Sequence, residues 1–281
     1  MSGELPLSSS SAARVSSLAC PIDLSSLDKG DGAWRCPDGH AYDIAREGYV
    51  NLLPPGRPAR QKAGDDLESI HARRRFLDAG HYAALAEHVA EVSAELSTGE
   101  GDTVDVGCGE GYYTARLAGA VVGLDMSRAG IRLAARRHTS VTFAVANATA
   151  MPIVPAAVDV AVSIFAPVVP DEFARIVRPG GHAVIAVPGA QHLAALRSLL
   201  YETWQPHDEV VPLHDDTRFT TVDTARLRGE ATLATPTELA DLISMTPYRY
   251  AVPPEAIARA LAAPTPFTTP IEFVVATIRR N

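Results

Sequence analysis

The chain has 281 residues, of which 47% are hydrophobic and 21% charged, so it can bury a sizeable core. Its 25 Lys and Arg face 33 Asp and Glu, and the net charge of -8 disfavours a general nucleic-acid binder, which needs clustered basic residues. Three cysteines exclude a disulfide framework. Since the sequence shows neither a secretory signal pattern nor a run of about 18 apolar residues, we expect a cytoplasmic protein.

The composition changes along the chain and predicts four segments. Residues 1–17 are Ser-rich and favour a disordered tail. Residues 18–53 form a turn-rich module that is too small for a hydrophobic core of its own, so an additional interaction must hold it together. Residues 54–82 begin as a linker rich in Pro, Gly and basic residues and continue as a connecting helix. The main domain then spans residues 83–281.

Helix and strand patterns alternate through the main domain. Strands are expected at residues 103–106, 121–125, 141–145, 158–165 and 182–189, then around 219–227 and at 271–278. Helices are expected at residues 112–120, 127–138, 190–204 and 236–245. Strands separated by helices predict an α/β fold with a doubly wound, parallel Rossmann-like sheet.

A glycine-rich turn follows the first of these strands, in "VDVGCGEGYYTARL". Gly107, Gly109 and Gly111 would let a ligand approach the backbone, although tight turns also use glycine for steric reasons alone. Asp125 ends the second strand, where a carboxylate can accept both hydroxyl groups of a ribose. The turn and this acid together predict a nucleoside site.

Two further residues favour S-adenosylmethionine over a nicotinamide dinucleotide. Asp105 precedes the first glycine, where its charge would repel a pyrophosphate but bind an ammonium group. Asn147, with Ala148 beside it, follows the third strand and is placed to flank an adenine. Asn147 is equally compatible with a role as a turn former.

Several segments resemble a known family, among them "DVGCGEGYYT", "GLDMSRAGIRLAARR", "VTFAVANATAMPI", "EFARIVRPGGHAVIAVPGAQHL" and "LISMTPY". They are similar to the class I methyltransferase domain of the bacterial 23S ribosomal RNA guanine-N1-methyltransferases, which include macrolide-resistance enzymes. The segments "CPDGHAYDIAREGYVNLLP" and "ARRRFLDAGHYAAL" resemble that family's zinc module and connecting helix. The resemblance covers roughly residues 18–278.

The resemblance implies a seven-stranded sheet whose last strand is antiparallel. It implies S-adenosylmethionine over the three glycines, with Asp125 on the ribose and Met126 beside it. The implied substrate is a guanine in a hairpin loop of 23S ribosomal RNA, and homodimers occur in the family. The implied zinc ligands are a Cys-x-x-Cys pair followed by Cys and His.

The first metal-binding pair departs from that pattern, because it reads "CPID" and places Asp23 where the second cysteine is expected. Two interpretations stay open. Cys20, Asp23, Cys36 and His40 can still close a tetrahedral zinc site, since carboxylate oxygen also binds zinc. Alternatively the metal is absent, because a carboxylate is a harder ligand than a thiolate, and apolar residues hold the module together.

Methyl transfer is an in-line displacement, so positioning the two reactants can supply most of the catalysis. Candidates to assist loss of the guanine N1 proton are His192 and Tyr201, and Phe165 is a candidate to stack on a planar substrate. His81 and Tyr82 are candidates to cap the methionine end of the cofactor. Each of these residues also has a structural interpretation as a packing or capping residue.

The acceptor has two interpretations. Residues 1–82 hold ten Lys and Arg against eleven Asp and Glu, which is nearly neutral for an RNA-reading module. Basic residues that can still line a cleft toward phosphates are Arg57, Arg60, Lys62, Arg73, Arg74 and Arg75. The alternative is a methyltransferase acting on a small-molecule natural product. A noncatalytic binding module is disfavoured, because the glycines and Asp125 are intact.

Overall fold

The computed structural model describes residues 17–54, 66–99 and 101–281. The predicted tail, apart from Ser17, and most of the predicted linker lie outside these residues, as do Arg57, Arg60 and Lys62. Within the described ranges, no helix is both long and apolar enough to cross a membrane.

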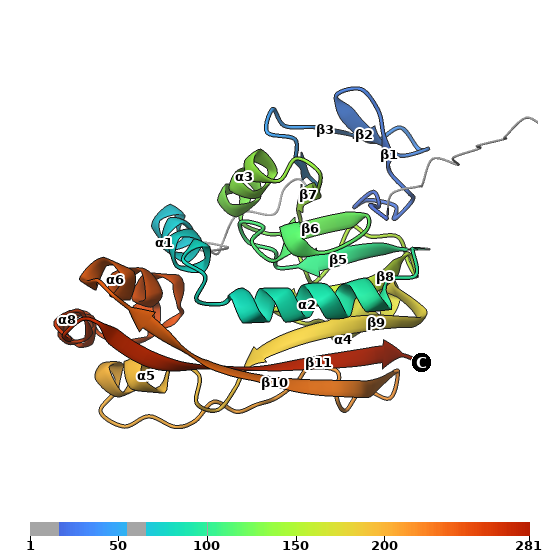
Figure 1. Cartoon of the computed structure of the whole chain (residues 1–281). Coiled ribbons are helices and arrows are strands. Elements are labelled where there is room, and N and C mark those ends of the chain that lie inside the picture. The colour runs from blue at the N-terminus through green and yellow to red at the C-terminus, as the bar shows by residue number, and fades with distance from the viewer. Residues whose placement is uncertain (1–16, 55–65, 100) are drawn as a thin grey trace, which may run out of the picture.

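An eight-stranded sheet forms the centre of the molecule, with strand order β10-β11-β9-β8-β5-β6-β7-β4 (Figure 1). Strands β4 to β9 run parallel, whereas β11 is antiparallel to both β9 and β10. This arrangement confirms the predicted doubly wound fold with an antiparallel last strand. The main domain supplies the seven predicted strands, β5 to β11, and the eighth, β4, comes from the N-terminal module. The strand bounds are β4 (Val50–Asn51), β5 (Asp102–Val106), β6 (Val121–Asp125), β7 (Thr142–Val145), β8 (Val158–Ile164), β9 (Val177–Pro188), β10 (Phe219–Leu233) and β11 (Phe267–Arg280).

The helices begin where the sequence supplies capping groups. Asp66, Ser127 and Thr235 each accept a hydrogen bond from a backbone N–H in the first turn of the following helix. Helix α2 lies across the sheet in Figure 1 and packs on β8 and β9. The helix bounds are α1 (Leu67–Asp78), α2 (Ala83–Leu96), α3 (Arg128–Arg137), α4 (Pro170–Ile176), α5 (Ala194–Leu200), α6 (Pro236–Met245), α7 (Tyr248–Ala251) and α8 (Pro254–Leu261).

Two helices are shorter than the sequence pattern predicts. The segment 112–120 holds only a 3-10 turn, η1 (Thr114–Arg116), because Gly119 takes a positive φ of 85° and the chain must enter β6 directly. The predicted helix at 190–204 is reduced to α5. Leu193 adopts a left-handed φ of 55°, and its N–H donates to Pro270 O, so the preceding residues stay attached to β11.

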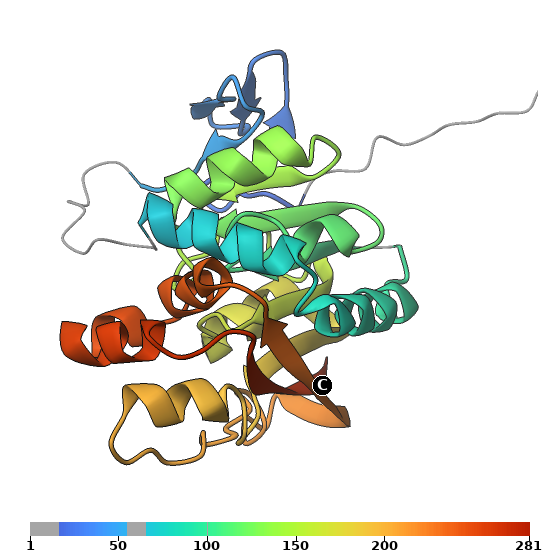
Figure 2. The same ribbon diagram turned by 60° about the vertical axis from the view of Figure 1, so that its left-hand side comes forward.

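The small N-terminal module is fused to the main sheet rather than tethered to it. Its own sheet comprises β1 (Asp28–Lys29), β2 (Ala33–Arg35) and β3 (Ala41–Asp43). Figure 2 shows this module at the end of the molecule opposite to α5 and α8. Strand β4 pairs in parallel with β7, and Leu52 N donates to Val145 O at 2.9 Å. Leu18, Trp34 and Leu52 belong to the same apolar cluster as the centre of the main sheet.

Because the core is shared, a cavity in the module should destabilise the whole protein. Leu52→Ala is expected to lower the free energy of unfolding by about 2–4 kcal/mol in a single transition, since Leu52 is 1% exposed. Leu67→Ala makes the same change at a residue that is 54% exposed and should cost much less. Denaturant unfolding, followed by both circular dichroism and Trp fluorescence, measures the free energy of unfolding and the number of transitions. Two separate transitions in the Leu52→Ala protein would contradict a common core.

Candidate active site

A cavity of about 640 Å³ opens at the carboxyl ends of the central strands. Its walls come from the turn after β5, the tip of β6, the segment after β8 and the loop after β9. Helix α1 and the residues between α6 and α7 close its sides. This is the edge of an open α/β sheet where ligands are expected to bind.

The glycine-rich turn forms one wall of the cavity, and its glycines present backbone atoms to the cavity with no side chain over them. Gly107 N and Cys108 N both donate to Leu124 O, at 2.8 and 3.0 Å, which fastens the turn to β6. Gly107 has a φ of 80°, and a Cβ built on it would lie 2.3 Å from Ala166 Cβ. Gly109 has a φ of 56° and faces open space, since the nearest atom to a Cβ there is Arg73 Nη1 at 3.9 Å. Both positions therefore favour glycine for conformational reasons.

Two carboxylates flank this turn. Asp125, at the end of β6, accepts from Gly109 N at 2.9 Å through one oxygen and from Ser127 N at 2.7 Å through the other. Asp105 is buried at the end of β5 and accepts from Thr114 Oγ1 at 2.6 Å. Burial raises the pKa of Asp105 to about 7, and the nearby Asp125 charge adds to this effect. A cationic group bound beside Asp105 would favour its ionised form.

Aromatic side chains form the opposite wall. Phe165 directly follows β8, takes a left-handed φ of 54° and is 42% exposed, although most large apolar side chains are buried. Its ring lies 6.2 Å from the His192 ring in a stacked arrangement and 6.3 Å from the Tyr82 ring. A strained backbone that exposes an aromatic ring in a cavity is typical of a binding surface. The cavity thus offers a flat apolar wall.

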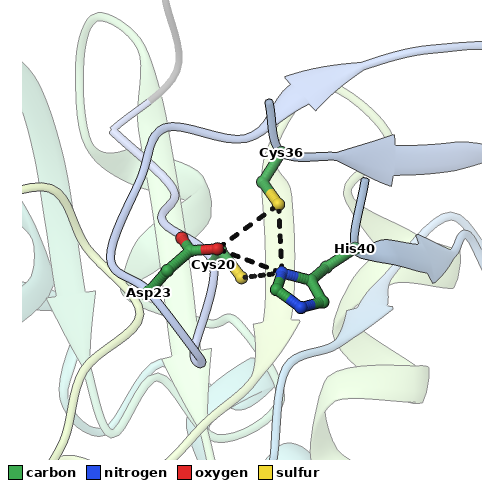
Figure 3. A group of neighbouring side chains, drawn as sticks. All are labelled: Cys20, Asp23, Cys36 and His40. Atoms are coloured by element: carbon green, nitrogen blue, oxygen red, sulfur yellow. Dashed lines mark hydrogen bonds and ion pairs between the residues drawn. The ribbon is translucent and has the colours of Figure 1, made fainter. Parts of the chain in front are cut away.

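A second group of side chains lies in the N-terminal module (Figure 3). One ligand atom each from Cys20, Asp23, Cys36 and His40 lies within 4.8 Å of the others. His40 Nδ1 is 3.5 Å from Cys20 Sγ and 3.3 Å from Cys36 Sγ. Asp23 Oδ2 is 3.0 Å from His40 Nδ1 and 3.5 Å from Cys36 Sγ. A tetrahedron with zinc bonds of about 2.0–2.3 Å has edges of roughly 3.3–3.8 Å. The separations of 3.0–3.5 Å given above are close to these edges, so the four atoms are near enough to one another to surround one ion.

Neighbouring residues orient two of these ligands. The other oxygen of Asp23 accepts from Ser25 N at 2.8 Å and from the Ser25 hydroxyl group, which turns Oδ2 toward the cluster. These hydrogen bonds from Ser25 lower the pKa of the Asp23 carboxyl below its usual value. Tyr42 Oη lies 3.1 Å from Cys20 Sγ, where its O–H can donate to a thiolate. Such outer contacts are the usual support of a metal ligand.

Comparisons with known proteins match both the N-terminal module and the main domain. A zinc-ribbon profile described as RlmA, N-terminal matches residues 18–60, and a methyltransferase-domain profile matches residues 103–181. The 23S rRNA (guanine(748)-N(1))-methyltransferase of Streptomyces fradiae is 39% identical over 64% of this chain and 66% of its own length. A protein of Micromonospora griseorubida named as a 23S rRNA (guanine-N(1)-)-methyltransferase is 39% identical over 64% of this chain and 68% of its own. The chain belongs to the 23S rRNA (guanine-N1)-methyltransferase family.

A Bacillus subtilis member of the family, named for the same activity, is 33% identical over 65% of this chain and 68% of its own length. The chain is thus an S-adenosylmethionine-dependent methyltransferase, and the cavity fits this cofactor. Its glycine turn presents bare backbone, Asp125 is fixed at the neighbouring strand tip and Asp105 provides a buried acid.

The structure separates the predicted site residues into two groups. Those that line the cavity are Tyr82, Asp105, Gly107, Gly109, Asp125, Phe165 and His192. Those that lie outside its lining are Gly111, Met126, Asn147, Ala148, His81 and Tyr201. Three of the second group have visible structural roles. Gly111 packs tightly against α3, Asn147 Oδ1 accepts from Thr149 N in a turn, and the His81 ring contacts Phe76.

Other lining residues were not among the predicted site residues. Glu110 lies within the predicted turn and Tyr113 follows it, so their place at the cavity could have been inferred from the neighbouring Gly109. His207 and Tyr248 come from distant parts of the chain and meet through a 3.2 Å hydrogen bond between Nε2 and Oη. No local periodicity predicts that contact, because it depends on how the segment after α5 folds back.

The bare backbone at Gly109 gives a direct test of the cofactor turn. Gly109→Val is expected to abolish binding of S-adenosylmethionine, because valine disfavours a φ of 56° and its side chain would enter the cavity. Isothermal titration measures the affinity. Gly180→Val is the matched control, since Gly180 also has a positive φ, lies in open space and does not line the cavity. Unchanged affinity in the Gly109→Val protein would contradict the placement of the cofactor.

Proposed function

We propose that this protein methylates N1 of a guanine in a hairpin loop of 23S ribosomal RNA. The observation that supports this acceptor most directly is the fusion of a zinc-ribbon module, which matches the RlmA N-terminal profile, to a methyltransferase domain. The relatives are named for guanine N1 of 23S rRNA, at position 748 in the Streptomyces fradiae protein. Such an activity supports a cytoplasmic location, where ribosomal RNA is modified.

The aromatic wall suits a base that leaves its stack. Enzymes that act on a base commonly turn it out of the helix or loop and stack it on aromatic side chains. Phe165 provides such a surface, because its exposed ring stands at the carboxyl edge of β8, beside the glycine turn. The segment "IFAP" at this place lacks the Asn/Asp-Pro-Pro-aromatic motif of enzymes that methylate exocyclic amines. A ring nitrogen is therefore the better acceptor.

The chain's own residues act by binding and orienting the reactants. Bound S-adenosylmethionine supplies an electrophilic methyl group on a positively charged sulfur. We assign the backbone of Gly107 and Gly109 to the surface under the cofactor, Asp125 to its ribose and Asp105 to its ammonium group. Holding the acceptor in line with the methyl group then supplies much of the rate enhancement.

Basic residues near the cavity contribute less than the sequence pattern indicated. Arg73 lines the cavity, and its Nη2 donates to Met245 O at 3.2 Å. Arg75 instead makes a two-point ion pair with Asp241 of α6, and Arg74 lies 3.7 Å from Asp78. We therefore assign Arg73 to the RNA path, whereas Arg75 holds α1 against α6.

We further propose that Cys20, Asp23, Cys36 and His40 bind a structural zinc ion. All four positions would be filled by protein ligands, so the ion would stabilise the module rather than take part in methyl transfer. The two cysteines and Asp23 would be bound as anions. Because Asp23 stands where the family pattern has a cysteine, this site should bind zinc more weakly than a Cys₃His site.

Methyl transfer to RNA tests the proposed acceptor. The purified protein, S-adenosylmethionine and a transcript of the 23S rRNA hairpin that contains the target guanine should yield 1-methylguanosine after nuclease digestion and chromatography. A transcript with adenine at that position and the Gly109→Val protein are the negative controls. If wild-type protein binds S-adenosylmethionine but leaves the RNA unmethylated, the acceptor is a different molecule, and small natural products become the class to test.

Variants at position 23 test the metal site. Purified wild-type protein should contain zinc. In competition with a chelator, Asp23→Ala should weaken zinc binding by about tenfold or more, because losing even a residue that only supports a metal ligand costs about that much affinity. Asp23→Cys should bind zinc more tightly than the wild type. Asp31→Ala removes an exposed acid outside the cluster and should change nothing. Equal affinity in the three variants would refute a role of Asp23 as a ligand.

A further inference from the structure

Tyr82 and His192 meet at the wall of the active-site cavity although they are 110 residues apart in the sequence. Tyr82 is the residue before α2, and His192 lies in the loop between β9 and α5. Tyr82 Oη is 3.1 Å from His192 Nε2, and both side chains are buried. The donor in this hydrogen bond is not evident from the distance alone.

The other ring nitrogen of His192 settles the direction. Glu272 N lies 3.3 Å from His192 Nδ1, and a backbone N–H can only donate. Nδ1 must therefore accept, and the single proton of a neutral imidazole must lie on Nε2. Burial lowers the pKa of His192 to about 3, with His207 and Arg197 adding to the effect, so the ring is neutral at physiological pH. His192 Nε2–H consequently donates to Tyr82 Oη.

Because Tyr82 Oη accepts a hydrogen bond from His192, its own proton must point away from His192. Across residues 17–54, 66–99 and 101–281, Tyr82 Oη has no second hydrogen-bond partner. Burial also raises the pKa of Tyr82 above its usual value, so the group keeps its proton. A buried O–H without an acceptor is costly, and Tyr82 lines the cavity next to Phe165. We therefore expect a ligand in the cavity to place a hydrogen-bond acceptor next to the Tyr82 hydroxyl group.

We propose that Tyr82 donates a hydrogen bond to O6 of the target guanine and is a catalytic residue, with His192 as its positioning residue. This inference rests on the proposed function. The Tyr82 ring lies 6.3 Å from the Phe165 ring and at 63° to it, so a guanine stacked on Phe165 would lie near Tyr82 with its plane inclined to the tyrosine ring. In an adenine an amino group replaces O6, and two donors would then face each other.

The contact would act on the reaction as well as on specificity. Guanine N1 gives its proton to water, and the negative charge left on the ring is shared between N1 and O6. A donor fixed at O6 stabilises that charge. The N1 electron pair then forms the bond to the methyl carbon while the carbon–sulfur bond breaks, which leaves S-adenosylhomocysteine. Tyr82 keeps its proton throughout and serves as the hydrogen-bond donor.

Variants at the two positions test this assignment on the hairpin transcript. Tyr82→Phe should lower kcat by about 100-fold, the scale for losing one donor to a developing charge, and leave the Kd for S-adenosylmethionine within twofold of wild type. His192→Leu should lower kcat similarly. His192→Gln offers an N–H near the place of Nε2 and should recover most of the lost activity. Tyr250→Phe removes a hydroxyl group from an exposed tyrosine outside the cavity and should behave as wild type.

The outcomes separate this inference from the function on which it rests. If wild-type protein forms no 1-methylguanosine, the proposed function is wrong and the role of Tyr82 falls with it. If the wild type is active and Tyr82→Phe has the same kcat, only the role of Tyr82 is wrong. An increase in the cofactor Kd that matches the loss of activity would assign Tyr82 to the cofactor's methionine end instead. Should Tyr82→Phe fail to fold, equal activity of His192→Leu and His192→Gln would overturn the proposal.

Discussion

The active site depends on a single carboxylate that ties two strand ends together. Asp125 accepts from the backbone of Gly109 through one oxygen and from Ser127 through the other, while Leu124 O accepts from Gly107 N and Cys108 N. The turn after β5 therefore cannot move independently of the tip of β6. A glycine-rich loop without these hydrogen bonds would be mobile. The hydrogen bonds therefore fix this wall of the cavity without placing a side chain in the space for the ligand.

The sequence predicts most of the wall that the glycine-rich turn forms. It also names the aromatic residues of the opposite wall as candidates, but not how they contact one another. The turn and its acid follow buried strands directly, so their meeting at one sheet edge could be inferred from strand order. Tyr82 and His192 meet only because β11 holds the loop before α5, a contact 80 residues away along the chain. Asn147 shows the other limit, since a polar residue after a strand serves a ligand or a turn with the same local pattern.

The module illustrates how a metal site can tolerate a changed ligand. Replacing a thiolate by the shorter, harder carboxylate should weaken zinc binding, yet Ser25 turns Asp23 into the cluster and Tyr42 supports Cys20. Packing adds a second source of stability, because Leu18 and Trp34 are buried in the core of the main sheet. A metal and an apolar core are alternatives from the sequence alone, whereas the structure contains both a cluster of four potential ligands and continuous packing.

Strand β4 has a consequence for the solubility of the enzyme. It is only two residues long, yet it occupies the outer side of β7, whose N–H and C=O groups would otherwise face water. Unpaired strand borders of this kind recruit other chains by backbone pairing. The N-terminal module therefore covers part of this edge of the catalytic domain. We expect a truncated enzyme that begins after residue 54 to expose the edge of β7 to backbone pairing with other copies.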